Sequence, residues 1–464
     1  MADWSQLPKE LLEEIAKRLE SPFYLLRFRS VCSSWRSSVS SRPRRLPGRF
    51  PFLTNHGICD TTLGFHLSQR TVFLMGLPNF RNQTNPDRWL VKIEEDVPGR
   101  MHLLNPLSRF QLNPLPESFP KVLDLSKFWV FELGGEYVLH YVHFRPFGNG
   151  NSFGDAGNLY MEKVVFMCLG SESNDFVLLT IHVSGKLAMF KSEDKRWTII
   201  HDMPSPYDDV ILFKGQFYAV DGTGRTVIVG LHSNLSVVAN PVFGGDKKFL
   251  VESSGELLVV DMYLSMAPET DLDVDDEIIQ LQFNGCLTER TVRFKVFKLD
   301  REGKRLFEMK SLGDRVLFLG DDCTFSASAS ELSGCKGNCI FFTDNFFYTS
   351  GEDEGVFKGR DIGVFDLDDG SIAPLSDYPE YSKLFWPPPD WIAPTQSARR
   401  KHSSHPAALA STSSGDLANL CKQIKWIKVA IDMRLFMSQG YFTTFCKHLN
   451  LGGELLRGSQ FLVN

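Results

Sequence analysis

The stretch "LPKELLEEIAKRLESPFYLLRFRSVCSSWRSSV", Leu7 to Val39, decides the fold of the N-terminal part of this chain. Its apolar residues recur every three or four positions, which is the spacing of one face of an α-helix. They are Leu7, Leu11, Leu12, Ile15 and Leu19, and, after Ser21–Pro22, Leu25, Phe28, Val31, Cys32, Trp35 and Val39. Ser5 suits a helix N-cap and Pro8 suits a first turn. We predict one helix before Ser21 and one or two helices after it.

The second half of this stretch leaves three interpretations, because Arg27, Arg29 and Arg36 surround Cys32 and Trp35. They are a basic helix for nucleic acid, a site around a reactive cysteine, and the apolar face of an interaction module. Neighbouring arginines would lower the pKa of a thiol and make it a better nucleophile. Cys32 however lies on the apolar stripe with Trp35, so a packing role is favoured and the arginines are expected to form a solvated flank.

A DNA-binding regulator is the alternative function. It rests on six arginines, which are Arg27, Arg29, Arg36, Arg42, Arg44 and Arg45. Residues 1–50 carry 10 Lys and Arg against 5 Asp and Glu, and residues 396–464 carry 9 against 3. The body between them carries 31 basic and 48 acidic residues, and such a body repels a phosphate backbone. We therefore expect no nucleic-acid partner.

Composition bounds the class of protein. The chain has 464 residues, of which 43% are hydrophobic and 23% charged, as expected for two or three folded domains. No apolar run approaches the roughly 20 residues that span a bilayer, and charges interrupt the first twenty residues, unlike in a secretory signal. Nine scattered cysteines indicate a reducing compartment. We expect the nucleus, the cytoplasm or both, and no membrane partner.

From about residue 50 to 394 the apolar period changes to two and the runs shorten, which is typical of β-strands. A glycine followed by an apolar strand recurs at intervals of 30 to 48 residues. These glycines are Gly185, Gly215, Gly255, Gly303, Gly337 and Gly370. Glycine at such positions indicates hairpin turns, and repeats of this length are typical of β-propeller blades. We predict a propeller of about six to eight blades, with a stack of β-sandwich domains as the competing architecture.

The close of the chain changes character twice. In "FWPPPDWIAP", Phe385–Pro394, the two tryptophans Trp386 and Trp391 are expected to pin a stiff segment to the propeller. Residues 395–464 are predicted to form a flexible linker and a basic amphipathic helix, in which Leu417, Leu420, Ile424, Ile427, Ile431 and Leu435 make the apolar face. Membrane or partner binding and docking on the body are both open for this helix, and docking is favoured.

Motifs for catalysis or metal binding fail on inspection. Cys323, Cys335 and Cys339 lack a fourth ligand nearby, so buried strand cysteines are favoured over zinc. The run Asp271–Glu277 lacks the glycine and the final glutamate of a calcium loop, and Gly148–Gly154 lacks the pattern of a phosphate loop. His140 and His143 fall on opposite faces of a strand. We predict no cofactor and no metal, while a propeller enzyme with converging ligands stays a third hypothesis.

The N-terminal stretch resembles an F-box. The resemblance rests on a Leu-Pro pair, a Leu-Leu and Ile spacing, a closing Leu and "LLRFRSVCSSWR". It implies a three-helix module in residues 1–45 that docks on a Skp-type adaptor and, through it, on a cullin. The residues it marks for adaptor binding are Leu7, Pro8, Leu11, Leu12, Ile15, Leu19, Leu25, Phe28, Val31, Cys32 and Trp35. Trp35 is expected to anchor in or beside that interface.

The region 50–394 resembles plant F-box proteins with a kelch-like β-propeller. The stretches that carry the likeness are "LLNPLSRFQLNPLP", "LAMFKSEDKRWTII", "VILFKGQFYAV" and "FWPPPDWIAP". The resemblance implies a non-catalytic substrate-recognition subunit of an SCF-type (Skp-cullin-F-box) E3 ubiquitin ligase, whose propeller binds a target protein for ubiquitination. The expected fold class is α+β multidomain: an F-box, an all-β propeller and a helical tail. The substrate, the loops that bind it and the oligomeric state do not follow from the sequence.

Overall fold

The structure is a computed structural model of the chain. It describes residues 6–39 without 18, 20 and 21, and, within 50–392, residues 50–53, 59–77, 87–97, 100–108, 111–112, 115–120, 123, 127–141, 161–169, 175–182, 184–202, 204–242, 244–268, 287–300, 302, 304–321, 323–332, 334–343 and 362–392. The chain divides into two compact units, residues 1–45 with 397–464 and residues 46–396. The predicted linker and helix of 395–464 lie outside the described residues and stay predictions.

The described part of the first unit is a small helical module. Its helices are α1 (Lys9–Lys17), α2 (Pro22–Ser30) and α3 (Ser33–Ser37). Pro8 precedes α1, and its carbonyl oxygen accepts the amides of Leu11 and Leu12, both at 3.1 Å. Pro8 is therefore the N-cap residue, one position earlier than the predicted first turn. Ser5, the predicted cap, lies outside the described residues.

The second unit consists mainly of antiparallel sheets. Sheet A holds nine strands, in the order β4 (Arg100–Leu104), β3 (Arg88–Val97), β2 (Cys59–Gly76), β5 (Trp129–Tyr141), β6 (Met161–Cys168), β7 (Phe176–His182), β8 (Leu187–Lys191) and β9 (Arg196–Ile199), with β1 (Phe50–Leu53) paired to β2. The two halves of sheet A meet between β5 and β6 in one residue pair, Tyr137 with Val164. By contrast, β2 and β5 pair along their length.

Three further sheets follow along the chain. Sheet B is β10 (Tyr207–Phe213), β11 (Gln216–Asp221), β12 (Thr226–Val229) and β13 (Leu235–Ala239). Sheet C is β14 (Lys247–Ser253), β15 (Glu256–Pro268), β16 (Leu287–Asp300) and β17 (Arg305–Met309). Sheet D has the order β19 (Thr324–Ser328), β18 (Arg315–Leu319), β20 (Cys339–Thr343), β21 (Ile362–Asp366) and β22 (Ile372–Pro374), with β18 and β20 parallel.

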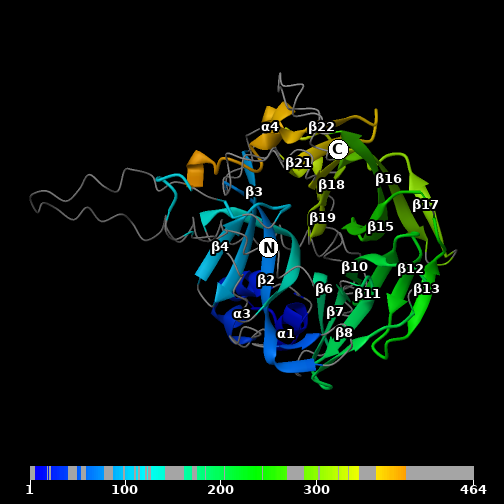
Figure 1. Cartoon of the computed structure of the whole chain (residues 1–464). Helices are drawn as coiled ribbons and strands as arrows, with labels where there is room; N and C mark the ends of the chain where they lie inside the picture. Colours follow the sequence, from blue (N-terminus) through cyan, green and yellow to red (C-terminus); the bar gives the residue numbers. More distant parts are fainter. Residues whose placement is uncertain are drawn as a thin grey trace, which may run out of the picture. The chain divides into compact units, whose positions relative to one another are not determined.

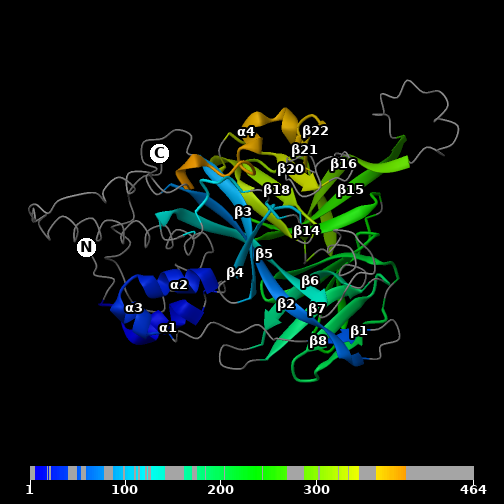
Figure 2. The ribbon, with the colours of Figure 1, turned by 60° about the vertical axis from the view of Figure 1, so that its left-hand side comes forward.

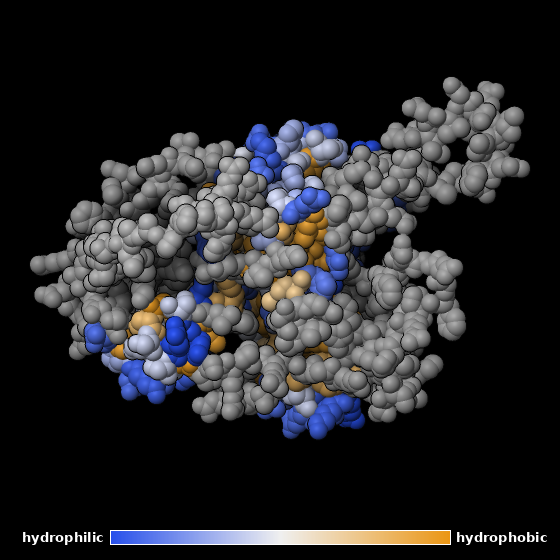
Figure 3. Space-filling view, turned by 90° about the vertical axis from the view of Figure 1, so that its left-hand side faces the viewer, coloured by the Kyte–Doolittle hydropathy of each residue, from blue (hydrophilic) through white to orange (hydrophobic). Residues whose placement is uncertain are grey.

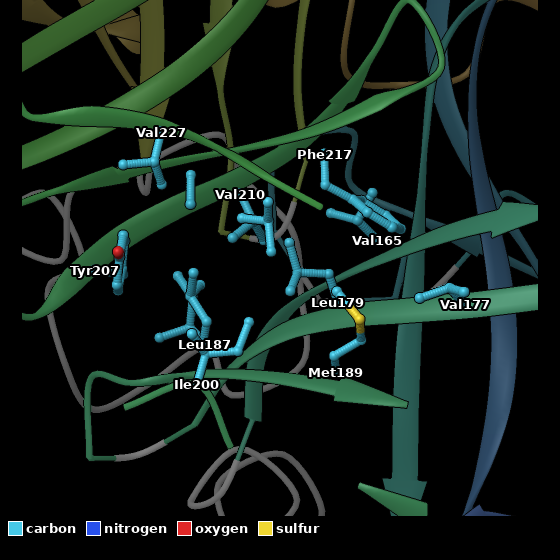
Figure 4. Close-up of a cluster of buried hydrophobic side chains, with 13 residues drawn as sticks. Val165, Val177, Leu179, Leu187, Met189, Ile200, Tyr207, Val210, Phe217 and Val227 are labelled. Carbon is cyan, nitrogen blue, oxygen red and sulfur yellow. The ribbon is translucent and has the colours of Figure 1, made fainter. Parts of the chain in front are cut away.

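Figure 1 shows these sheets following one another around a common centre, as predicted for a propeller. Apolar side chains fill the space between successive sheets. Between β6–β8 and sheet B, Leu179 and Met189 pack with Val210 and Phe217 (Figure 4). Other clusters of buried side chains lie between sheets B and C and between sheets C and D. Sheets B and C are therefore each packed on both faces, unlike the outer faces of a sandwich stack.

The halves of sheet A also pack on each other. Leu67 and Leu139 of the first half lie in one buried cluster with Leu178, Phe190 and Trp197 of the second half. Two halves that share a core and a single strand pair behave as two packed sheets. The described strands thus form four hydrogen-bonded sheets, and the predicted count of six to eight blades is not confirmed.

The predicted glycine turns are confirmed at four positions. The loop Lys214–Gly215 has φ angles of 49° and 72°, the two positive values that a two-residue turn requires. Positive φ angles also occur at Gly185, Gly255 and Gly370. At the predicted turn glycine Gly337 the positive φ, 65°, belongs instead to Asn338. A β-carbon on Gly337 would lie 2.4 Å from the Gly313 oxygen, so close packing explains that glycine. Gly303 lies outside the described residues.

A polar cluster joins the inner strands of the sheets. Lys163 Nζ on β6 lies 2.9 Å from Asp209 Oδ1 on β10, and it donates to Thr324 Oγ1 on β19 at 3.3 Å. The Leu250 amide on β14 donates to Asp209 Oδ2 at 2.7 Å. Thr324 Oγ1 in turn donates to the Leu250 carbonyl at 2.5 Å. Four residues from sheets A, B, C and D are thereby linked at one point, which we call the inner junction.

After β22 the chain forms a segment without strands, residues 375–392, which we call the C-terminal strap. It contains the 3-10 turn η6 (Leu375–Asp377), the helix α4 (Pro379–Ser382) and the 3-10 turn η7 (Asp390–Ile392). The fully buried side chains here are Leu384 and Phe385. Trp386 is only half-buried, and Trp391 contacts the Phe128 ring at 5.4 Å. Leu384 and Phe385 are thus less exposed than the two tryptophans that were predicted to pin this segment.

Candidate protein-interaction site

The helical module has a core of its own, formed by some of the residues predicted to bind a partner. Leu12, Phe28 and Trp35 are 0%, 5% and 8% exposed. The Phe28 and Trp35 rings lie 4.6 Å apart. Burial of these side chains holds three short helices together, since such helices are marginal in isolation. Trp35 therefore packs inside the module, and its expected role in or beside an adaptor interface stays a prediction.

The other predicted residues lie around this core with part of their surface open. Leu7, Ile15, Leu19, Leu25, Val31 and Cys32 are half-buried and pack against the core. Leu11 is half-buried and Pro8 exposed, and neither belongs to the core cluster. Val39 joins the cluster at its edge. The structure thus brings the predicted residues together in one module but divides them into an inner and an outer set.

Two of the arginines bind backbone instead of forming a purely solvated flank. Arg29 donates from Nη1 to the carbonyl oxygens of Arg36, at 3.2 Å, and Val39. Arg36 donates from Nε to the Arg29 carbonyl at 3.3 Å. The last carbonyls of a helix lack partners within it, so these guanidinium groups stabilise the ends of α2 and α3. This structural role accounts for Arg29 and Arg36 without a phosphate.

An aromatic pair on α2 was not singled out from the sequence. The Phe23 and Tyr24 rings lie 5.7 Å apart, and the Arg27 guanidinium stands 4.6 Å above the Phe23 ring. Both rings are half-buried and lie outside the core cluster. The helical period of α2 hides them, because they occupy positions off the apolar stripe.

The three cysteines that were considered as zinc ligands in the sequence are free thiols. Cys323 and Cys339 are buried, as predicted, and Cys335 is half-buried. Burial raises the pKa of the Cys335 thiol to about 12 and that of Cys339 to about 11. Such thiols stay protonated at neutral pH and are poor nucleophiles and ligands. Within the described ranges no group of three or more His, Cys, Asp or Glu side chains is placed to hold a metal ion.

The remaining sequence candidates contribute no described site. Residues 148–154 and 271–277 and His143 lie outside the described residues, and His140 is described only as a β5 position paired with His66. No helix among the described residues is long and apolar enough to cross a membrane. The residues that are coloured in Figure 3 include both hydrophobic and hydrophilic ones. The helical module is thus the most coherent candidate site.

Comparison with known protein families assigns both parts of the chain. The F-box domain model matches residues 4–46, and the KIB1-4 beta-propeller model matches residues 64–366. The chain belongs to the plant F-box proteins that carry a KIB1-4 β-propeller. The predicted order, an F-box followed by a propeller region, is confirmed.

Curated relatives from Arabidopsis thaliana align with this chain along nearly their full length. F-box protein SKIP23 is 50% identical over 402 residues, which cover 84% of this chain and 96% of the relative. F-box protein At2g17036 is 39% identical over 84% of this chain and 95% of its own length. Putative F-box/kelch-repeat protein At5g24040 is 30% identical over 84% of this chain and 99% of its own. These matches give no support to the DNA-binding alternative.

Proposed function

We propose that this protein is the substrate-recognition subunit of an SCF-type E3 ubiquitin ligase and is itself non-catalytic. The observation that carries the proposal is the F-box match over residues 4–46 joined to a propeller match over 64–366. In this arrangement the F-box binds a Skp-type adaptor and thereby a cullin, while the propeller binds a target protein. The chain acts by raising the effective concentration of a substrate lysine near the ubiquitin-charged enzyme.

We assign adaptor contact to the outer set of the module. Leu12, Phe28 and Trp35 are occupied by the module's own core, so they shape the interface from within. Pro8 and Leu11 lie outside that core with surface open to a partner. Apolar side chains that remain exposed around a small rigid core are the type that supplies binding energy at interfaces.

For the propeller we infer five blades. Sheet A divides into β1–β5 and β6–β9 because its halves meet in one pair and share a buried core. Sheets B, C and D supply the other three blades. The inner junction is consistent with this count, since Lys163, Asp209, Leu250 and Thr324 come from the inner strands of four of these blades. Loops at the ends of such blades offer a wide surface for a substrate.

The nucleus, the cytoplasm or both are proposed as the site of action. Support comes from the cysteines, since five described ones are free thiols. Free thiols are typical of reducing compartments. A fluorescent fusion of the full chain in plant cells tests this, and secretion of the fusion would contradict it.

A pull-down of the full chain with a purified Skp-type adaptor tests the main proposal. We expect Pro8→Ala/Leu11→Ala to reduce adaptor binding about tenfold or more, because it removes apolar contact area without opening the core. Glu14→Ala/Lys17→Ala is the matched control on the same helix, since this ion pair is more than half exposed on both sides. Equal capture of wild type and Pro8→Ala/Leu11→Ala, or no capture of wild type, would refute the proposal.

A further inference from the structure

The C-terminal strap lies beyond the residues that the propeller family model covers. That model ends at residue 366, whereas the strap comprises residues 375–392. Figures 1 and 2 both show α4 beside β21 and β22 at the end of the last sheet. Leu384 and Phe385 follow α4 and are each 0% exposed. A surface appendage would leave such side chains open to solvent, so the strap has a buried partner.

One partner is β3 in the first blade. The Leu90 amide donates to the Leu384 carbonyl at 2.7 Å, and Trp89 Nε1 donates to the Phe385 carbonyl at 3.1 Å. On one side β3 pairs with β2, with Leu90 opposite Leu74. On its other side the pairs with β4 begin only at Lys92. The Leu90 amide therefore lies in the part of β3 that does not pair with β4. The strap accepts the hydrogen bond of this amide in place of a neighbouring strand.

The other partner is sheet D. The Phe341 ring on β20 lies 5.6 Å from the Tyr381 ring and 5.8 Å from the Phe385 ring. Tyr381 Oη accepts the Lys336 amide at 3.3 Å. Phe385 thus packs on the last sheet through its ring and binds the first sheet through its carbonyl oxygen. One residue contacts both ends of the ring of blades.

In the part of the chain that the structure describes, no strand of sheet D pairs with a strand of the first blade. Sheet D consists of β18–β22, and the first blade consists of β1–β5. The two sets of strands come from separate parts of the chain and share no described strand. The two meet at Gly134, where a β-carbon would lie 3.1 Å from Phe325 Cβ, and at Asp321, whose amide donates to the Leu107 carbonyl at 2.9 Å. The strap adds to these contacts two hydrogen bonds to β3 and ring contacts to Phe341 on β20.

We propose that the C-terminal strap is the latch that closes the propeller ring. It joins the last blade to the first by inserting Leu384 and Phe385 between sheet D and β3. Among the described residues, its hydrogen bonds and ring contacts outside the strap itself are with the first and last blades. Release of the strap therefore opens the joint between the first and last blades and leaves sheet B intact. This inference concerns closure of the propeller and holds whether or not the chain serves a ubiquitin ligase.

Hydrogen exchange of the full chain, followed by mass spectrometry, tests the latch. In Phe385→Ala we expect amides of residues 88–92 and 339–343 to exchange about tenfold faster or more. Residues 339–343 lose the ring that packs on Phe341, and residues 88–92 lose strap hydrogen bonds that this packing holds in place. Peptides of β11 are expected to change less than about twofold. Trp386→Ala is the matched control, since Trp386 is the next residue and only half-buried. It is expected to leave both regions near the wild-type rate.

A second variant separates release of the latch from general loss of structure. Trp89→Phe keeps a large ring but removes the indole donor to the Phe385 carbonyl. We expect it to accelerate exchange in residues 88–92 and in the strap by a few-fold, with β11 unchanged. Equal acceleration in β11 in both variants, or unchanged exchange in residues 88–92 in Phe385→Ala, would overturn the inference.

Discussion

Asp209→Ala is the perturbation that probes the joint between blades most directly. The Asp209 side chain is nearly inaccessible to solvent and serves three partners. Its carboxylate accepts the Val210 amide at 2.8 Å and the Leu250 amide at 2.7 Å, and lies 2.9 Å from Lys163 Nζ. Alanine removes all three interactions at once and leaves the Lys163 ammonium, 15% exposed in its side chain, without its carboxylate.

The expected magnitude follows from what is left without a partner. Removing one member of a buried ion pair costs about 3–5 kcal/mol, and a buried amide without an acceptor costs about 1–3 kcal/mol. The costs overlap because the same cavity admits water to all of these groups, and Lys163 keeps some solvent contact. We therefore expect Asp209→Ala to lower the free energy of unfolding by about 3–5 kcal/mol. Asp209→Asn keeps one acceptor oxygen and is expected to lose about 1–3 kcal/mol.

Equilibrium urea unfolding of the full chain, followed by tryptophan fluorescence, measures these losses. The matched control is Glu256→Ala, which removes a carboxylate from an ion pair with Lys298 that is 46% and 45% exposed. Exposed pairs contribute about 0–1 kcal/mol, so a small change is expected. If Asp209→Ala destabilises no more than Glu256→Ala does, the inner junction does not hold the blades and the reasoning is refuted.

Three further predictions concern other sites. Burial raises the pKa of Asp208 to about 6 from 3.8, while the Lys248 amide that it accepts opposes the rise. The folded chain thus binds this proton more tightly than the unfolded chain, so stability falls as pH rises from about 4 to about 6. Asp208→Asn carries no proton that titrates here, so its stability should not fall in this pH range. Thermal unfolding should therefore show the variant gaining on wild type between about pH 4 and pH 6, by about 1 kcal/mol in the free energy of unfolding, a value reduced for solvent access. Gly134→Val should lower the free energy of unfolding by about 1–3 kcal/mol, because even a β-carbon there would lie 3.1 Å from Phe325 Cβ; an unchanged urea curve would contradict the close contact. Cys335 should react with iodoacetamide at pH 8 far more slowly in the native chain than in urea, because burial raises its pKa to about 12, and equal rates by mass spectrometry would contradict this.

Local sequence signals carried much of the fold. The apolar period of Leu7–Val39 marked the helical module, and the glycines at Gly185, Gly215, Gly255 and Gly370 marked turns with positive φ. Both signals are local, because a helical face and a tight turn are set by residues a few positions apart. The number of blades could not be predicted from such local signals. It depends on which strands pair, and the single Tyr137–Val164 pair between two halves of one sheet leaves no mark in the sequence.

The candidate site shows the same division. Composition and spacing determined which residues belong to the helical module, because apolar side chains on one stripe must be buried somewhere. Only the tertiary structure decided where each one goes. It placed Trp35 inside the core and left Pro8 exposed, and it turned Arg29 from a solvated charge into a donor to the end of α3. Likewise, "FWPPPDWIAP" predicted a stiff aromatic segment. Its contacts were not predicted: the carbonyls of Leu384 and Phe385 accept hydrogen bonds from Leu90 and Trp89, almost three hundred residues earlier in the chain. Contacts between distant segments depend on the packing of whole sheets, and that packing is what the sequence alone leaves open.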